Sequence, residues 1–206
     1  MLDNKEIDDS SYTSIGGDFA NVFDNSDYIA LINSTDTAGI ILRTHLILED
    51  FINIWCSKIT GTEDLFDGPF IAFKAKLNIS KNLGLDKQFY DVLDKFNTIR
   101  NRYSHRRQYL LEESSLDSLC TSIDMLPPTE KILSCQKFSI FISGTNTSTG
   151  EKVQQEYQYK EADLNKKIII IFIVLVMKLL IWMQSEFVRR GISYTIISDL
   201  PVPTTT

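Results

Sequence analysis

The sequence predicts an all-α fold, a bundle of four to five helices with a small β-hairpin inserted before the last helix. Apolar residues recur at steps of three and four through residues 36–59 and 86–107, which is the spacing of one buried helix face. Residues 162–190 are long and strongly apolar, and apolar and polar residues alternate within residues 137–160. A chain of 206 residues suits one well-buried domain, which we place at residues 34–190.

Residues 1–33 precede this domain and are rich in Asp, Asn and Ser, so we expect a loose N-terminal arm with one short helix. The first strong helix runs from Asp36, a favourable N-cap residue, to Ile59, and Gly61 is expected to end it. The apolar or small positions that define its buried face are Ile41, Thr44, Leu48, Phe51, Ile52, Trp55 and Ile59.

Two further helices are expected before the middle of the chain. One begins at Asp67-Gly68-Pro69, because proline suits the first turn of a helix, and ends at Leu83-Gly84. The next begins at Asp86 and ends near Arg107. The lysines of the earlier helix are expected to form a solvated face: Lys74, Lys76 and Lys81.

The second half of the chain holds the remaining expected elements. Residues 109–135 predict a short helix that Pro127-Pro128 interrupts. The hairpin of about residues 137–160 follows, with a long polar loop between its strands. Residues 191–206 are expected to form a disordered tail.

The apolar helix admits two interpretations, a core helix or a membrane span. Between Ile168 and Met183 its only charged residue is Lys178. The uninterrupted part, Ile168 to Met177, is shorter than the roughly 18–20 residues that a bilayer crossing needs. A helix that is apolar all round is also typical of the centre of a bundle, so we favour a core helix and do not expect a membrane partner.

Composition restricts the functional classes. The chain has 21 basic and 27 acidic residues and a net charge of −6, which counts against a protein that coats nucleic acid. Its three cysteines are odd in number and show no C-x-x-C spacing, which favours reduced thiols in a cytoplasmic protein over disulfides or a zinc site. No metal or other cofactor is expected. The acidic N-terminus does not resemble a signal peptide.

One run of residues carries most of the chemical interest: Arg100-Asn101-Arg102-Tyr103-Ser104-His105. On a helical wheel Arg100 falls at the margin of the apolar stripe, so its guanidinium must be paired or must face a cleft. Asn101 and His105 are four residues apart and share a neighbouring face. The surrounding basic residues form a candidate phosphate-binding patch: Arg102, Arg106 and Arg107.

This run resembles the R-N-x-x-x-H signature of the HEPN superfamily. The segments Leu65–Pro69, Phe73–Leu77 and Leu83–Leu85 resemble corresponding segments of the mannitol operon repressor (MltR) family, in the same order. The likeness covers about residues 36–107. It implies a helical bundle and pairing of two copies, so that two motifs face one cleft.

Two functions follow from the resemblance. The first is a non-enzymatic, repressor-like regulator of transcription that acts through protein contacts, because the chain is acidic and has no recognisable helix-turn-helix. The second is a metal-independent endoribonuclease of a toxin or defence type. In that enzyme His105 would take a proton from a ribose 2′-hydroxyl, Arg100 would stabilise the phosphate charge and Asn101 would orient either group.

A purely structural interpretation of the motif also stands. Arg100 would then pair with Glu49 or Asp50 of the first strong helix, and His105 would cap its own helix end, where a positive charge is favourable. His45, the other histidine, is expected to be buried or ion-paired rather than a ligand.

Overall fold

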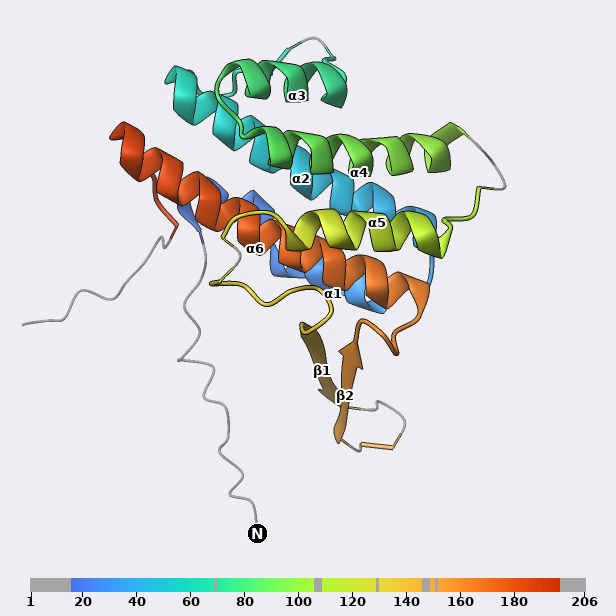
Figure 1. Ribbon diagram of the computed structural model, residues 1–206. Helices are drawn as coiled ribbons and strands as arrows, with labels where there is room; N and C mark the ends of the chain where they lie inside the picture. Colours follow the sequence, from blue (N-terminus) through green and yellow to red (C-terminus); the bar gives the residue numbers. More distant parts are fainter. Residues whose placement is uncertain are drawn as a thin grey trace, which may run out of the picture.

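The computed structural model describes residues 16–68, 70–105, 109–128, 130–145, 149–150 and 152–196. Within these residues six α-helices and one antiparallel pair of strands are present (Figure 1). The predominantly helical fold with a hairpin before the last helix is confirmed, but the described residues form six helices where four to five were predicted. The elements are α1 (Asn25–Asn33), α2 (Thr37–Thr60), α3 (Phe73–Asn82), α4 (Lys87–His105), α5 (Glu113–Asp124), β1 (Ser139–Thr145), β2 (Lys152–Gln158) and α6 (Leu164–Arg190).

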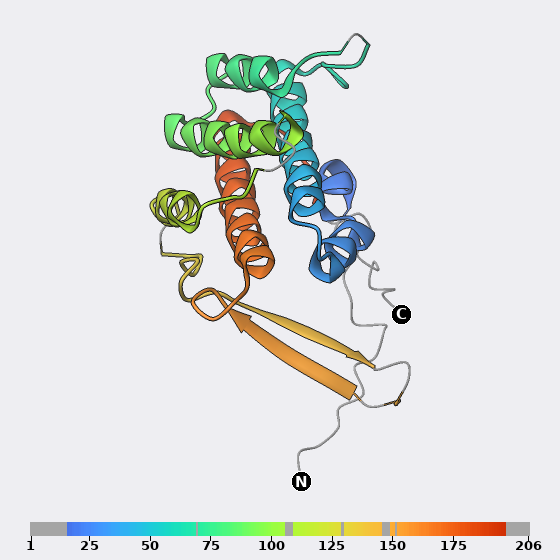
Figure 2. The same ribbon diagram turned by 90° about the vertical axis from the view of Figure 1, so that its right-hand side faces the viewer.

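The two longest helices, α2 and α6, lie side by side at the centre of the bundle, and α4 crosses them (Figure 2). α2 begins where the Asp36 carboxylate accepts hydrogen bonds from two backbone N–H groups, and it ends at Gly61 in the left-handed region at φ 68°. Aromatic rings join the two helices, with the Trp55 and Trp182 centroids 4.8 Å apart. α2 therefore matches its predicted bounds closely, because both of its end signals are local.

α6 is long and apolar enough to cross a membrane by length and composition alone. In this fold, however, 61% of its most apolar window is buried among the other helices. Lys178 is buried in the middle of α6, and its ammonium group donates to the backbone carbonyls of Ile123, Asp124 and Leu126 at 2.8–2.9 Å. The arrangement is compatible with a soluble protein in which α6 is the core helix.

The prediction of a loose arm is wrong for residues 16–33. Two short 3₁₀ helices, η2 (Gly17–Phe19) and η3 (Asn21–Phe23), lead into α1, and their Phe19 and Val22 side chains are fully buried. The segment packs against α2 because most of its large apolar side chains face the core. Residues 1–15 lie outside the described part of the chain.

The predicted tail also differs in part. Residues 192–196 return across the start of the described chain, where the Gly16 N–H donates to the Ile196 carbonyl at 2.7 Å. The Asp18 N–H donates to the Thr195 carbonyl at 2.9 Å. Apolar side chains in this return pack against the core, which explains its order. Residues 197–206 are not among those described.

α3 begins later than predicted, at Phe73 rather than near Asp67. Gly68 adopts a φ of 109°, which no helix accommodates, so the helix cannot begin there. The prediction of a solvated lysine face is also wrong for Lys76, because this side chain is buried and forms the ion pair described below.

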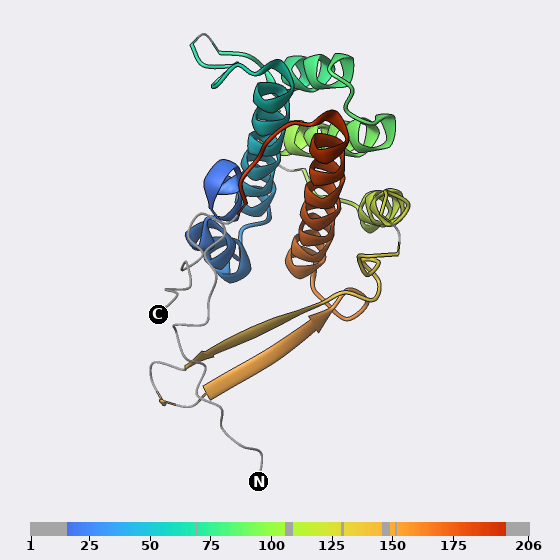
Figure 3. The same ribbon diagram turned by 90° about the vertical axis from the view of Figure 1, so that its left-hand side faces the viewer.

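The hairpin projects from the end of the bundle where α6 begins (Figure 3). β1 and β2 pair antiparallel, with Ser139 opposite Gln158 and Thr145 opposite Lys152. Tyr159, directly after β2, is buried, and its hydroxyl contacts the Asp117 carboxylate of α5 at 3.1 Å. That contact anchors the base of the hairpin to the helices.

Candidate functional site

α4 carries the R-N-x-x-x-H motif over its last turns. Arg100 is half-buried, and its Nη1 donates to the side-chain oxygen of its neighbour Asn101 at 3.0 Å. The Arg100 Nε is buried and has no hydrogen-bond partner among the residues described. A buried guanidinium donor without an acceptor is costly, so this arginine is under-satisfied in the single chain.

His45 of α2 lies across from α4 in the same region. Its Nε2 is 3.3 Å from the Asn97 Oδ1, and its ring packs 4.3 Å from the ring of Phe73. Burial lowers the pKa of His45, and the positive charge of Arg100 lowers it further. The guanidinium therefore acts electrostatically on His45, in a polar seam between α2 and α4 that we define by His45, Asn97, Arg100 and Asn101.

His105 lies in a different environment from Arg100. It is the last residue of α4, it is exposed, and no contact joins it to the guanidinium. Arg102 is exposed too, with its guanidinium 5.9 Å from the ring of Tyr109. Arg106 and Arg107, the remaining members of the expected basic patch, lie outside the described residues.

The ion pair expected for Arg100 is formed by another residue. Lys76 of α3 lies 2.7 Å from the Glu49 carboxylate and also donates to Asn53 at 3.2 Å. Among the residues described, Arg100 has no ion pair with Glu49, Asp50 or any other carboxylate. The structural interpretation in which Arg100 clamps two helices through a carboxylate does not fit this geometry.

Two cavities lie away from the motif. One of about 660 Å³ is lined by residues of η2, η3, the C-terminal half of α2 and the loops beside them, including Asp18, Asp50 and Lys58. Another of about 510 Å³ lies between α4 and α5, beside Lys95 and Met125. Neither is lined by Arg100, Asn101 or His105, so neither joins the three expected catalytic residues.

Two exposed leucines of α2 lie within one turn of His45. Leu42 and Leu46 of α2 are 39% and 61% exposed, and they are four residues apart on one helix face. α2 and α4 run in opposite directions, and Leu42 lies one turn before His45 while Asn101 lies one turn after Asn97 (Figure 1). Leu42 and Asn101 are therefore at about the same level beside the under-satisfied arginine.

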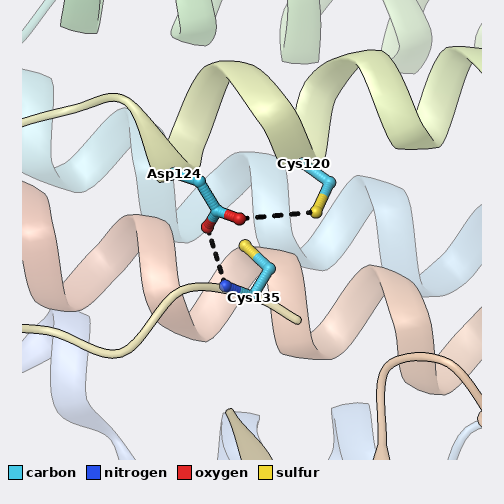
Figure 4. Close-up of side chains that lie close together, drawn as sticks. All are labelled: Cys120, Asp124 and Cys135. Atoms are coloured by element: carbon cyan, nitrogen blue, oxygen red, sulfur yellow. Dashed lines mark hydrogen bonds between the residues drawn. The ribbon is translucent and has the colours of Figure 1, made fainter. Parts of the chain in front are cut away.

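The cysteines give a second candidate group, which the sequence did not suggest. Cys120 and Asp124 of α5 and Cys135 of the following loop bring their ligand atoms within 4.8 Å of one another (Figure 4). These residues are the ones in the described chain that could hold a metal. One of the three ligands is the Asp124 carboxylate, and Cys135 is distant from Cys120 in the sequence. A search for C-x-x-C spacing therefore misses this group.

Comparison with protein-family models, with curated proteins and with solved structures gives no significant match. The HEPN and mannitol-repressor resemblance therefore rests on the residues of this chain alone.

Proposed function

We propose that the chain is a HEPN-type, mannitol-repressor-like regulatory protein of the cytoplasm that acts by binding another protein through the α2–α4 seam. The observation that carries the proposal is the state of Arg100. Its guanidinium is half-buried, and the part of the chain that the structure describes provides neither a partner for its Nε nor a carboxylate beside it. An acceptor from outside the chain would satisfy that donor.

The surroundings of Arg100 favour a protein as the source of that acceptor. The exposed pair Leu42 and Leu46 flanks the seam, and apolar side chains around a desolvated arginine are typical of the centre of a protein interface. A carboxylate surrounded by apolar groups fits this edge. The simplest partner is a second copy of the chain, as the family resemblance implies.

Self-association of the purified protein tests the proposal. Sedimentation velocity is expected to show a dimer for the wild type and a monomer for Leu46→Asp, because the introduced charge would be buried in the interface. Val188→Asp is the matched control, since Val188 is 69% exposed on α6, away from the seam, and this variant should remain a dimer. A wild-type monomer at all concentrations, or equal association of Leu46→Asp and wild type, would contradict the proposal.

The endoribonuclease remains the second candidate, and the same under-satisfied arginine favours it. A phosphate would also accept from Arg100, and the exposed Arg102 and His105 lie on the same helix end. In one chain, however, Arg100 and His105 do not meet. Cleavage would need a histidine from a second copy, or a rearrangement of the end of α4.

A further inference from the structure

We propose that Cys120, Asp124 and Cys135 form a zinc-binding site that fixes the loop after α5 to the helical bundle. The two cysteine sulfurs and the Asp124 carboxylate lie within 4.8 Å of one another and face a common space between α5 and the loop (Figure 4). Thiolate and carboxylate are ligands that zinc accepts in tetrahedral sites.

The scaffold positions two of these ligands on one helix face. Cys120 and Asp124 are four residues apart on α5, so their side chains stack on the same side of the helix. Cys135 is fully buried, and the loop places it opposite them. With zinc–sulfur bonds of about 2.3 Å, the ligand atoms of a tetrahedral site are roughly 3.8 Å apart. Side-chain rotations that move these atoms by about 1 Å would therefore close the site.

The carboxylate is already oriented for this role. One Asp124 oxygen accepts from the Cys135 backbone N–H at 2.7 Å, and the other oxygen lies 4.0 Å from the Cys120 sulfur. A hydrogen bond to the oxygen that does not bind the metal is how proteins commonly orient a ligating carboxylate.

Charge balance supports a divalent cation. Zinc binding displaces the thiol protons to solvent, and the two thiolates and the carboxylate then carry three negative charges. The zinc ion and the ammonium group of Lys178 together balance them. Lys178 is held beside the site by the carbonyls of Ile123, Asp124 and Leu126, so the buried group is neutral with the metal bound.

The Gln136 side chain is exposed, and its amide nitrogen lies 3.7 Å from the Cys120 sulfur, on the outer side of the cluster. A water molecule would supply the fourth ligand. Three protein ligands and one water satisfy zinc. Because Cys135 leads into β1, the metal would set the position of the hairpin relative to α5.

Cobalt substitution in the reduced, metal-free full chain tests the site. One Co²⁺ per chain is expected, with a thiolate-to-metal charge-transfer band and the intense visible bands of tetrahedral cobalt, and one equivalent of Zn²⁺ should remove both. Cys120→Ser and Cys135→Ser are expected to lose the charge-transfer intensity. Cys56→Ser is the matched control, because Cys56 is the third buried cysteine and lies on α2 against Ser80, and it should bind as the wild type does.

Asp124→Asn provides a second test if a serine variant fails to fold. The amide keeps an acceptor for the Cys135 N–H but loses the charge, and we expect zinc affinity to fall at least about 10-fold in competition with a chromogenic chelator. Absence of the cobalt bands in the reduced wild type would overturn the proposal. So would metal uptake that is unchanged in both serine variants, or a Cys120–Cys135 disulfide in a protein that takes up no metal when reduced.

Discussion

The Lys76 ammonium group lies 2.7 Å from the Glu49 carboxylate, in a pair whose side chains are only 10% and 22% exposed. This pair joins α3 to α2 next to the polar seam. Lys76 therefore pairs with one of the two carboxylates that Arg100 was expected to contact.

Lys76→Met should destabilise the fold, because it leaves the Glu49 charge partly buried without a partner. We expect the free energy of unfolding in urea to fall by about 2–4 kcal/mol. Lys74→Met is the control, since Lys74 pairs with Asp94 at an exposed position and should cost about 0–1 kcal/mol. Equal effects of the two variants would show that Lys76 is not buried as described.

His45 should make stability depend on pH. Burial, and then the charge of Arg100, lower its pKa below the ordinary 6.5, so the unfolded chain takes up the proton first as the pH falls. The stabilisation that neutral His45 gives the folded state is therefore complete above about pH 6.5. It is lost as the pH falls through the lowered pKa of His45. Urea unfolding between about pH 7.5 and 5 should show a smaller loss of stability in His45→Gln than in the wild type. His105→Gln, at the exposed histidine, should keep the wild-type dependence.

Arg100→Gln separates a charge effect from an ion-pair clamp. Because Arg100 has no carboxylate partner among the described residues, we expect the free energy of unfolding to change by no more than about 1 kcal/mol, whereas a broken buried pair costs about 3–5 kcal/mol. The pKa of His45, followed by NMR, should rise because a neighbouring positive charge is removed. Arg102→Gln should leave the pKa of His45 unchanged. A large destabilisation by Arg100→Gln would instead support the interpretation in which Arg100 joins two helices through an ion pair.

Phe19→Ala tests whether the residues before α2 belong to the core. Phe19 is fully buried, so its truncation should cost about 3–5 kcal/mol in urea unfolding. Phe70→Ala, at a phenylalanine that is 94% exposed, should change stability by less than about 0.5 kcal/mol. A negligible effect at Phe19 would return residues 16–33 to the status of a loose arm.

Elements with local signals could be predicted from the sequence. α2 has a capping Asp36, a regular apolar face and a terminal Gly61, and its observed bounds differ from the prediction by one residue at each end. The start of α3 could not be predicted in this way, because Gly68 and its neighbours fit a helix start and a loop equally well until the φ of Gly68 is known.

Contacts between distant segments could not be predicted. Glu49 is nearer in sequence to Arg43 and Lys58 than to Lys76, and only the packing of α3 on α2 selects Lys76. Cys120 and Cys135 meet because the chain turns back after α5, which no spacing rule contains. The burial of Phe19 likewise depends on α2 being in place to receive it.

RNA digestion tests most directly the proposal that the R-N-x-x-x-H motif of this regulator is not catalytic. Wild type and His105→Ala are incubated with structured and unstructured RNA in EDTA, with circular dichroism as a check that both are folded. We predict intact RNA in both reactions, because Arg100 and His105 lie in separate environments. Cleavage by the wild type that His105→Ala abolishes would contradict the account and establish the motif as catalytic.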